Sequence, residues 1–345
     1  MEDLRSLSFD ELTDKIKEMG FPAYRAKQMY EWMHVHLVRS LDEMTNIPKD
    51  LREKCRENFL FTALEIERMQ ESQIDGTRKY LFKCADGSLV ESVFMRYDFG
   101  NSVCVSSQVG CKMGCRFCAS TLDGWSRNLI PGEILDQIYS ISRDTGERVS
   151  HVVVMGTGEP MDNYDNVVRF IRMLTDENGL NISQRNVTVS TCGIVPKMYD
   201  LANENLAITL ALSLHAVNDE KRRTIMPVAE RYSIAELMDV CRNYFDVTGR
   251  RITFEYSLIA GVNDSKEDSD ALARLADGVM AHVNLIPVNP IKERDFVQPT
   301  RAAAESFKYR LEKKGISVTI RREMGRDIDG ACGQLRRRRM EETSC

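Results

Sequence analysis

Four of the ten cysteines of this chain lie within residues 104–118, CVSSQVGCKMGCRFC. Cys111, Cys115 and Cys118 have the spacing C-x3-C-x2-C, and Cys104 precedes Cys111 by seven positions. In a reducing compartment, closely spaced thiols indicate metal ligation or catalysis and not a structural disulfide framework. The spacing therefore predicts a metal centre bound by Cys111, Cys115 and Cys118, with Cys104 outside the ligand pattern.

Two kinds of metal centre remain open on spacing alone. A structural zinc site needs four ligands, usually as two pairs, and the sequence has no second C-x2-C, so His215 or Cys104 would have to supply the fourth ligand. An iron–sulfur cube is normally bound by four thiolates, and three thiolates would leave one iron open to a substrate. Gly110 and Gly114 would let the short loop wrap around a compact cluster.

The elements that must position these thiols follow along the chain. Apolar, strand-like runs alternate with helical segments, which predicts parallel strands with helical crossovers, in a β/α barrel or a doubly wound sheet. Reactive groups then lie at the carboxyl ends of the strands, where this sequence has Glu159, Ser190, His215 and Asn289. The predicted strands are residues 151–156, 186–191, 207–214, 252–259, 282–288 and 317–322.

The earlier part of the chain has a different pattern. Apolar residues at helical spacing from Ala26 to Leu37 predict one helix, and Pro48 predicts the start of another. Two strand-like runs flank Asp86 and Gly87, which predicts a hairpin. We therefore expect a small helical domain, a β-hairpin region and a β/α core, in residues 1–60, 61–100 and 101–345.

Composition excludes some classes of protein. A net charge of −5 argues against a protein that coats nucleic acid by bulk attraction. The segment Arg321 to Arg339 has seven arginines against three acids, so it is either a local phosphate-binding patch or a solvated tail. No apolar run approaches the ~18 residues of a membrane helix, and the acidic start MEDLRSLSFDEL is not a secretory signal. We expect a cytoplasmic protein without membrane association.

Longer motifs carry a family resemblance. The cysteine loop, with Phe117 before its last cysteine, resembles the signature of radical S-adenosylmethionine (SAM) enzymes, and GTGEP at 156–160 resembles their methionine-binding element. In that superfamily three cysteines bind a [4Fe-4S] cluster whose open iron binds SAM, and the reaction yields a 5′-deoxyadenosyl radical. Nearly the whole chain resembles the RlmN family, through the motifs CVSSQVGC, MGTGEP, VTVSTCGIVP, ALSLHAVND, HVNLIPVNP and DIDGACGQLR.

The resemblance implies a fold and a reaction. The fold would be α/β, a partial (TIM-like) β/α barrel with a small N-terminal helical domain and a β-hairpin extension. The RlmN family methylates carbon 2 of an adenosine in 23S rRNA and of an adenosine next to the tRNA anticodon. By resemblance, Cys332 is first methylated and then joined to the purine, Glu91 accepts the carbon 2 proton, and Cys104 releases the product through a transient disulfide to Cys332. The implied SAM contacts are Gly158, Glu159, Ser190, Ser213, Leu214, His215 and Asn289.

Other readings stay open at this point. The related Cfr enzymes methylate carbon 8, and Pro160 in GEP favours carbon 2. A zinc-stabilised, non-catalytic RNA-binding protein is the alternative from another class. Tyr24, Arg25 and Lys27 are either an RNA-docking surface, as proposed for the family's N-terminal domain, or part of a packing helix. The expected partners are 23S rRNA, tRNA and a reductant such as flavodoxin or ferredoxin, and the expected state is a monomer.

Overall fold

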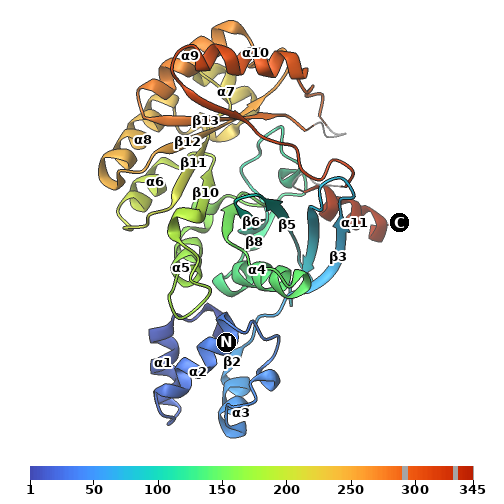
Figure 1. Cartoon of the computed structure of the whole chain (residues 1–345), viewed down its shortest axis with the longest axis vertical. Coiled ribbons are helices and arrows are strands. Elements are labelled where there is room, and N and C mark those ends of the chain that lie inside the picture. The colour runs from blue at the N-terminus through green and yellow to red at the C-terminus, as the bar shows by residue number, and fades with distance from the viewer. Residues whose placement is uncertain (290–293, 329–332, 345) are drawn as a thin grey trace.

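A mixed ten-stranded sheet is the main feature of the computed structural model, which describes residues 1–289, 294–328 and 333–344 (Figure 1). The strands are β3 (Glu65–Glu71), β4 (Arg78–Lys83), β5 (Leu89–Tyr97), β6 (Gly100–Cys104), β9 (His151–Val154), β10 (Val187–Thr191), β11 (Thr209–Ser213), β12 (Ile252–Leu258), β13 (Ala281–Pro287) and β14 (Ser317–Ile320). Their order is β14-β13-β12-β11-β10-β9-β6-β5-β4-β3. The strands from β14 to β6 are parallel, and those from β6 to β3 are antiparallel. The predicted α/β class with a hairpin extension is confirmed.

The sheet changes from parallel to antiparallel pairing at strand β6. This strand pairs in parallel with β9, where Ser102 lies opposite His151, and antiparallel with β5, where Cys104 lies opposite Val93. The six strands predicted from apolar runs are present, as is the β4–β5 hairpin. Strand β6 itself was not predicted, because its residues GNSVC have no apolar run or alternation that indicates a strand.

Helices connect the parallel strands, and their apolar faces form one continuous core with the sheet. Local signals mark where three of these helices begin: Pro131 begins α4, a Ser233–Glu236 capping box begins α8, and Thr300 caps α10. The helices are α4 (Pro131–Thr145), α5 (Tyr164–Leu174), α6 (Val195–Ala202), α7 (Asp219–Ile225), α8 (Ile234–Thr248), α9 (Lys266–Asp277) and α10 (Arg301–Glu312). Short elements are β7 (Gln108–Gly110), β8 (Trp125–Asn128) and the 3-10 turns η3 (Ala119–Thr121), η4 (Pro160–Asn163), η5 (Gln184–Asn186) and η6 (Pro227–Glu230).

The first sixty residues form a helical unit, which we call the N-terminal cluster. This unit has a hydrophobic core of its own. The predicted helix from Ala26 to Leu37 is shorter than expected, because α2 ends at His34. Leu37 has a φ of +56° and packs against the main core instead. The elements of this unit are β1 (Glu2–Asp3), η1 (Leu4–Ser6), α1 (Phe9–Glu18), α2 (Tyr24–His34), η2 (Leu41–Glu43), α3 (Lys49–Asn58) and β2 (Phe59–Leu60).

Buried polar contacts attach the N-terminal cluster to α4. Arg5, which is fully buried, forms an ion pair with Asp136 of α4. Asp136 also accepts a hydrogen bond of 2.6 Å from the backbone N–H of Leu64. In the same contact, Nδ1 of His34 lies 2.7 Å from the hydroxyl of Tyr139. Since α4 follows the cysteine loop in the chain, these contacts fix the N-terminal cluster to the part of the core that carries the loop.

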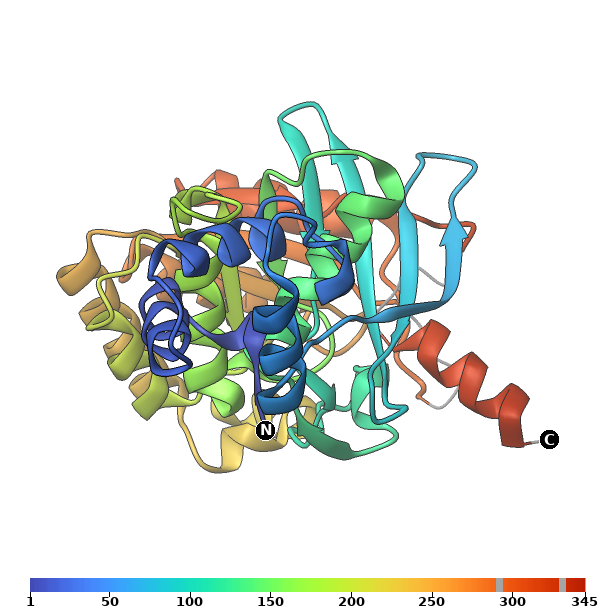
Figure 2. The same cartoon turned by 90° about the horizontal axis from the view of Figure 1, so that it is seen from below.

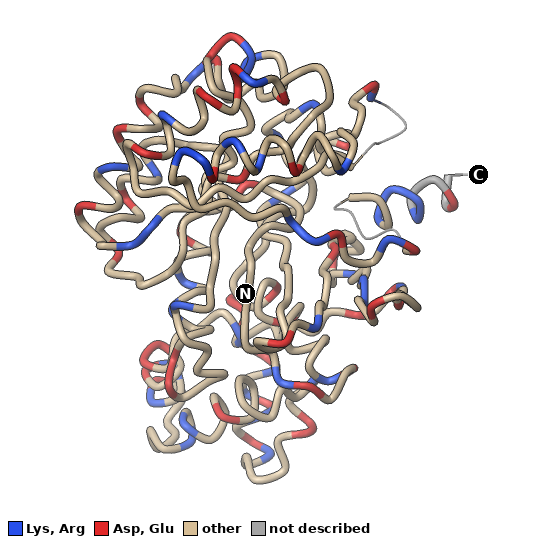
Figure 3. Tube along the Cα trace, turned by 45° about the horizontal axis from the view of Figure 1, so that its top comes forward, with Lys and Arg blue, Asp and Glu red and all other residues tan. Residues whose placement is uncertain are grey.

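A separate helix, α11 (Gln334–Ser344), lies beside β3 at the edge of the sheet (Figures 1 and 2). Its basic residues stand out in the charge-coloured view (Figure 3). Two ion pairs join it to β3: Arg68 with Glu342 at 2.7 Å, and Arg339 with Glu67 at 2.8 Å. Part of the predicted basic segment is therefore docked by ion pairs. In the part of the chain that the structure describes, no helix is long and apolar enough to cross a membrane.

Candidate functional site

The cysteine loop, residues 111–118, is fixed by its neighbours at both ends. Gly110 has a φ of +77°, and a Cβ there would overlap the carbonyl oxygen of Gly124, so glycine is required before the loop. The hydroxyl of Thr121 donates to the carbonyl oxygen of Cys118 at 2.9 Å. The loop thus has a defined conformation that its own hydrogen bonds support.

Cys111, Cys115 and Cys118 line one cavity of about 250 Å³ at the carboxyl ends of the parallel strands, which we call the cysteine cavity. Burial raises the pKa of the Cys111 thiol to about 12 and also raises that of Cys115, and the nearby Cys118 adds to both shifts. A bound cation favours the thiolate over the thiol. The three thiols therefore fit a positively charged iron–sulfur core as a bound group. Among residues 1–289, 294–328 and 333–344, no three His, Cys, Asp or Glu side chains are placed to bind a single metal ion.

The GTGEP segment forms another wall of the cysteine cavity. Gly158 has a φ of +109°, and a Cβ there would lie 2.6 Å from the side chain of Gln108. The Glu159 carboxylate is buried and accepts hydrogen bonds from the backbone N–H groups of Met161, at 3.0 Å, and Cys192, at 2.7 Å. Burial raises the pKa of Glu159. The Glu159 side chain therefore connects the ends of β9 and β10, and the backbone of this segment is the part best placed for a ligand.

Polar side chains from β10, β11 and β12 complete the cavity. The hydroxyl oxygens of Ser190 and Ser213 are 3.3 Å apart. His215 has a φ of +56°, and its Nδ1 accepts a hydrogen bond of 2.9 Å from the backbone N–H of Ser257. Burial lowers the pKa of His215 to about 3, so the ring is neutral at physiological pH and carries its hydrogen on Nε2. That N–H is a donor available to a bound molecule beside the ring of Phe117.

The two remaining predicted cofactor contacts differ in their placement. Asn289 lines the cysteine cavity, in agreement with its position after β13. The side chain of Leu214 is fully buried in the hydrophobic core and is not among the residues that line this cavity. Its backbone N–H donates to the carbonyl oxygen of Glu255 at 3.0 Å. A role for Leu214 stays a prediction and is restricted to its backbone.

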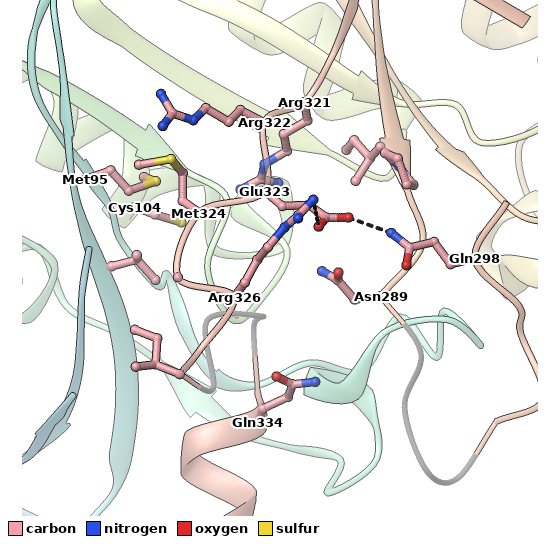
Figure 4. A pocket seen from close by; sticks show the side chains of 15 residues that line it. Met95, Cys104, Asn289, Gln298, Arg321, Arg322, Glu323, Met324, Arg326 and Gln334 are labelled. Atoms are coloured by element: carbon pink, nitrogen blue, oxygen red, sulfur yellow. Dashed lines mark hydrogen bonds and ion pairs between the residues drawn. The ribbon is translucent and has the colours of Figure 1, made fainter. Parts of the chain in front are cut away.

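A second cavity, of about 320 Å³, contains Cys104 and is called the Cys104 cavity (Figure 4). Cys104 is the last residue of β6, and its buried sulfur lies on the same wall as the thioethers of Met95 and Met324 (Figure 4). Glu323, which precedes Met324 in the chain, forms an ion pair with Arg326 and accepts a hydrogen bond from Gln298, each at 2.5 Å (Figure 4). Both sulfur atoms and polar groups therefore line this cavity.

The two cavities adjoin. Ile286, Asn289 and Arg321 line both of them. Cys104 is thus separated from the three loop cysteines, which line only the cysteine cavity, yet it lies in the neighbouring space. That Cys104 is not a metal ligand and that it has the resolving role both stay predictions.

Glu91 lies on β5 and is 3% exposed. Its Oε2 is 2.9 Å from Nζ of Lys79 and accepts a hydrogen bond of 2.6 Å from the N–H of Gly333. Its Oε1 accepts a hydrogen bond of 2.6 Å from the N–H of Arg336. Cys332 lies outside the described residues, and Gly333 directly follows it in the chain. The structure therefore brings Glu91 to the segment next to Cys332.

Several polar residues of the site were missed from the sequence. Glu255 lines the cysteine cavity, accepts a hydrogen bond of 2.8 Å from Asn284, and has a pKa that burial raises. Arg222 is fully buried and donates to the carbonyl oxygen of Cys192 at 2.6 Å, which supports the end of β10. A carboxylate inside the apolar strand ITFEYSLI was the available signal for Glu255, because unpaired charges are rare in such strands.

Comparisons with known proteins agree with this geometry. Residues 105–273 match the family model of the radical SAM superfamily, and residues 2–60 match that of the ribosomal RNA large subunit methyltransferase N-terminal domain. A probable dual-specificity RNA methyltransferase RlmN from Lachnospira eligens is 61% identical over 99% of this chain and 98% of its own. A relative of the same name from Lachnoclostridium phytofermentans is 58% identical over 99% of this chain and 96% of its own. The crystal structure of a radical SAM methyltransferase from Sphaerobacter thermophilus has a TM-score of 0.93 at 42% identity, over 97% of this chain and 99% of that one.

Proposed function

The chain belongs to the RlmN family of radical SAM RNA methyltransferases, and on this premise we propose that it methylates carbon 2 of adenosine in both 23S rRNA and tRNA. The observation that carries the proposal is the 61% identity to a dual-specificity RlmN relative across nearly the full length of both chains. Membership of the superfamily implies a [4Fe-4S] cluster and SAM. The tRNA target would be an adenosine next to the anticodon.

In this proposal, Cys111, Cys115 and Cys118 bind one [4Fe-4S] cluster, and the cysteine cavity binds SAM. When bound, the cluster and SAM together supply a methyl group and a radical able to remove a hydrogen atom from a methyl group. Three observations support these sites: three thiols line one cavity, His215 offers an N–H donor there, and the Gly158 segment lines the same cavity.

The chain's own residues would then transfer the carbon. Cys332 would carry the methyl group, and Glu91 would accept the proton from carbon 2. The Cys104 thiolate would then attack the Cys332 sulfur, so that the bond between this sulfur and the transferred carbon breaks, and a proton would complete the methyl group on the purine. An external reductant would reset the resulting disulfide, as expected for a transient cytosolic bond. Support comes from the hydrogen bond between Glu91 and Gly333 and from the position of Cys104 beside the cysteine cavity.

Carbon 8 is the alternative target. Mass spectrometry of nucleosides from 23S rRNA and tRNA of cells with and without the protein separates the two. We expect 2-methyladenosine to disappear from both RNAs in the deletion strain and to return when the gene is supplied again. Loss of 8-methyladenosine with unchanged 2-methyladenosine would contradict the proposal.

The role of Cys104 is tested by trapping. In the Cys104→Ala variant the RNA should remain covalently attached to the protein, because the second thiol that releases it is absent. A matched control is Cys241→Ala, which removes a buried thiol of α8 that lines neither cavity. Denaturing gels of the protein–RNA adduct, with mass spectrometry of the attached peptide, are the measurement. Absence of an adduct in Cys104→Ala under turnover conditions would remove this role.

RNA docking by the N-terminal cluster is part of the proposal. Tyr24 is 56% exposed, and the guanidinium of Arg25 lies 4.8 Å from the centre of its ring. An exposed aromatic ring next to a cation suits a surface that binds nucleic acid bases and phosphates. A flavodoxin- or ferredoxin-type reductant and a monomeric state complete the proposal.

A further inference from the structure

Lys79 of β4 carries a charge that the fold places in its interior. The side chain is 0% exposed, and its ammonium lies 2.9 Å from the carboxylate of Glu91, which is 3% exposed. Its neighbours on the strand, Tyr80 and Leu81, are also fully buried. Moving two charges out of water has a penalty of several kcal/mol per ion, and an apolar pair of the same size is often as stable. Stability alone therefore does not account for this lysine.

Glu91 has a second set of partners at the start of the C-terminal helix α11. The N–H groups of Gly333 and Arg336 donate to its two oxygens, each at 2.6 Å. The first N–H groups of a helix have no partner within the helix, and a carboxylate at that end is a favourable cap. Glu91 is thus the cap of α11, although 242 positions separate it from Gly333. Three donors occupy its two oxygens in this arrangement.

This arrangement conflicts with the proposed role of Glu91 unless part of it changes. To accept a proton, an oxygen of Glu91 must come within hydrogen-bond distance of the substrate. The donors from Gly333 and Arg336 lie at the start of a helix whose ion pairs to β3, Arg68 with Glu342 and Arg339 with Glu67, are partly exposed and therefore weak. The donor from Lys79 belongs to β4, which is paired with the strand of Glu91 in the sheet. The helix is therefore the partner that can leave, and Lys79 is the one that stays.

We propose that Lys79 is the positioning residue of Glu91 and that the first turn of α11 is a latch on the same carboxylate. RNA binding would replace the two backbone donors, and the Lys79 ammonium, 2.9 Å from Oε2, would then hold the Glu91 carboxylate in its orientation. The inference rests on the proposed function, because it presupposes that Glu91 accepts the carbon 2 proton. It assigns to Lys79 an effect on proton removal and none on the methylation of Cys332.

The variant Lys79→Met removes the ammonium and keeps an apolar side chain of similar length. We expect its rate of 2-methyladenosine formation to fall about tenfold or more, since a well-placed general base contributes at least about a hundredfold. The fraction of S-methylated Cys332, measured by peptide mass spectrometry, should stay within about twofold of wild type. Lys79→Arg should recover most of the rate, because it restores a buried cation next to Glu91.

Hydrogen exchange tests the latch without any turnover. In the protein without RNA, the amides of Gly333 and Arg336 should be protected, and a tRNA anticodon stem–loop should accelerate their exchange. Glu91→Gln should accelerate it without RNA. Arg68→Gln is the matched control, since it removes a distant contact of α11 and should leave these two amides protected. An exchange rate that RNA does not change would overturn the latch.

The outcomes separate this inference from the function on which it rests. If the wild-type protein forms no 2-methyladenosine, the proposed function fails. If it does and Glu91→Gln is fully active, the assignment of Glu91 fails. If Glu91→Gln is inactive and Lys79→Met is as active as wild type, the role of Lys79 fails. If Lys79→Met and Lys79→Arg both lost 2-methyladenosine formation and Cys332 S-methylation to the same extent, Lys79 would have a structural role only. This result would also overturn the proposed positioning role.

Discussion

Acid should weaken the attachment of the N-terminal cluster to the core through His34. The ring is fully buried, and burial, together with the nearby charge of Arg5, lowers the pKa of His34 from 6.5 to about 3. The unfolded chain takes up a proton at this histidine below pH 6.5, whereas the folded chain does not, so the free energy of unfolding falls as the pH falls. At about pH 5 the difference is about 1.5 pH units at 1.36 kcal/mol each, or about 2 kcal/mol.

The decrease in the free energy of unfolding can be measured by urea denaturation of the cofactor-free, reduced protein. Unfolding is followed by circular dichroism at about pH 7.5 and about pH 5. The variant His34→Asn keeps a polar atom near Tyr139 and has no imidazole, so its loss of stability between the two pH values should be about 2 kcal/mol smaller than that of wild type. His36→Asn is the control, because the His36 side chain is 50% exposed. If wild type and His34→Asn lost the same stability on acidification, the reasoning from burial would be refuted.

Three further predictions concern the loop, the interface and the cavity. Gly110→Ala should reduce the iron bound per protein after reconstitution, measured by iron analysis, because a Cβ would overlap the carbonyl of Gly124 and displace the cysteine loop. Asp136→Ala should lower the free energy of unfolding by about 3–5 kcal/mol in urea titrations, since it leaves the buried cation of Arg5 without its ion-pair partner. Glu255→Ala should weaken SAM binding to the reconstituted protein about tenfold in equilibrium dialysis, which corresponds to loss of about one hydrogen bond to a charged group. Unchanged iron content, unfolding free energy or dissociation constant would contradict the respective prediction.

Local sequence signals were sufficient for much of the scaffold and for the cysteine loop. Apolar runs predicted the later parallel strands, and capping residues such as Ser233 and Thr300 stand where helices begin. Cys111, Cys115 and Cys118 were found because all three lie within eight consecutive residues. These features depend on residues that are close together in the chain, so the sequence alone is sufficient to predict them.

Contacts between distant segments could not be predicted in the same way. No residue near Lys79 in the chain indicates its burial, because that burial depends on the pairing of β4 with β5. The contact between Glu91 and Gly333 joins residues that are 242 positions apart in the chain and has no local signature. Leu37 followed the helical spacing of α2, but the helix ends three residues earlier, where the chain turns toward the main core. Tertiary packing, which no short window of sequence reports, decided each of these cases.

The edge strands of the main sheet, β14 and β3, do not pair with each other in the described part of the chain. Antiparallel strands continue the sheet beyond β6, where further parallel strands would be needed to complete a cylinder. A complete cylinder could enclose a free metabolite but would exclude a nucleotide that is still joined to its neighbours on both sides. With one side of the cylinder missing, a folded polymer can present a single base from outside while its backbone remains in solvent.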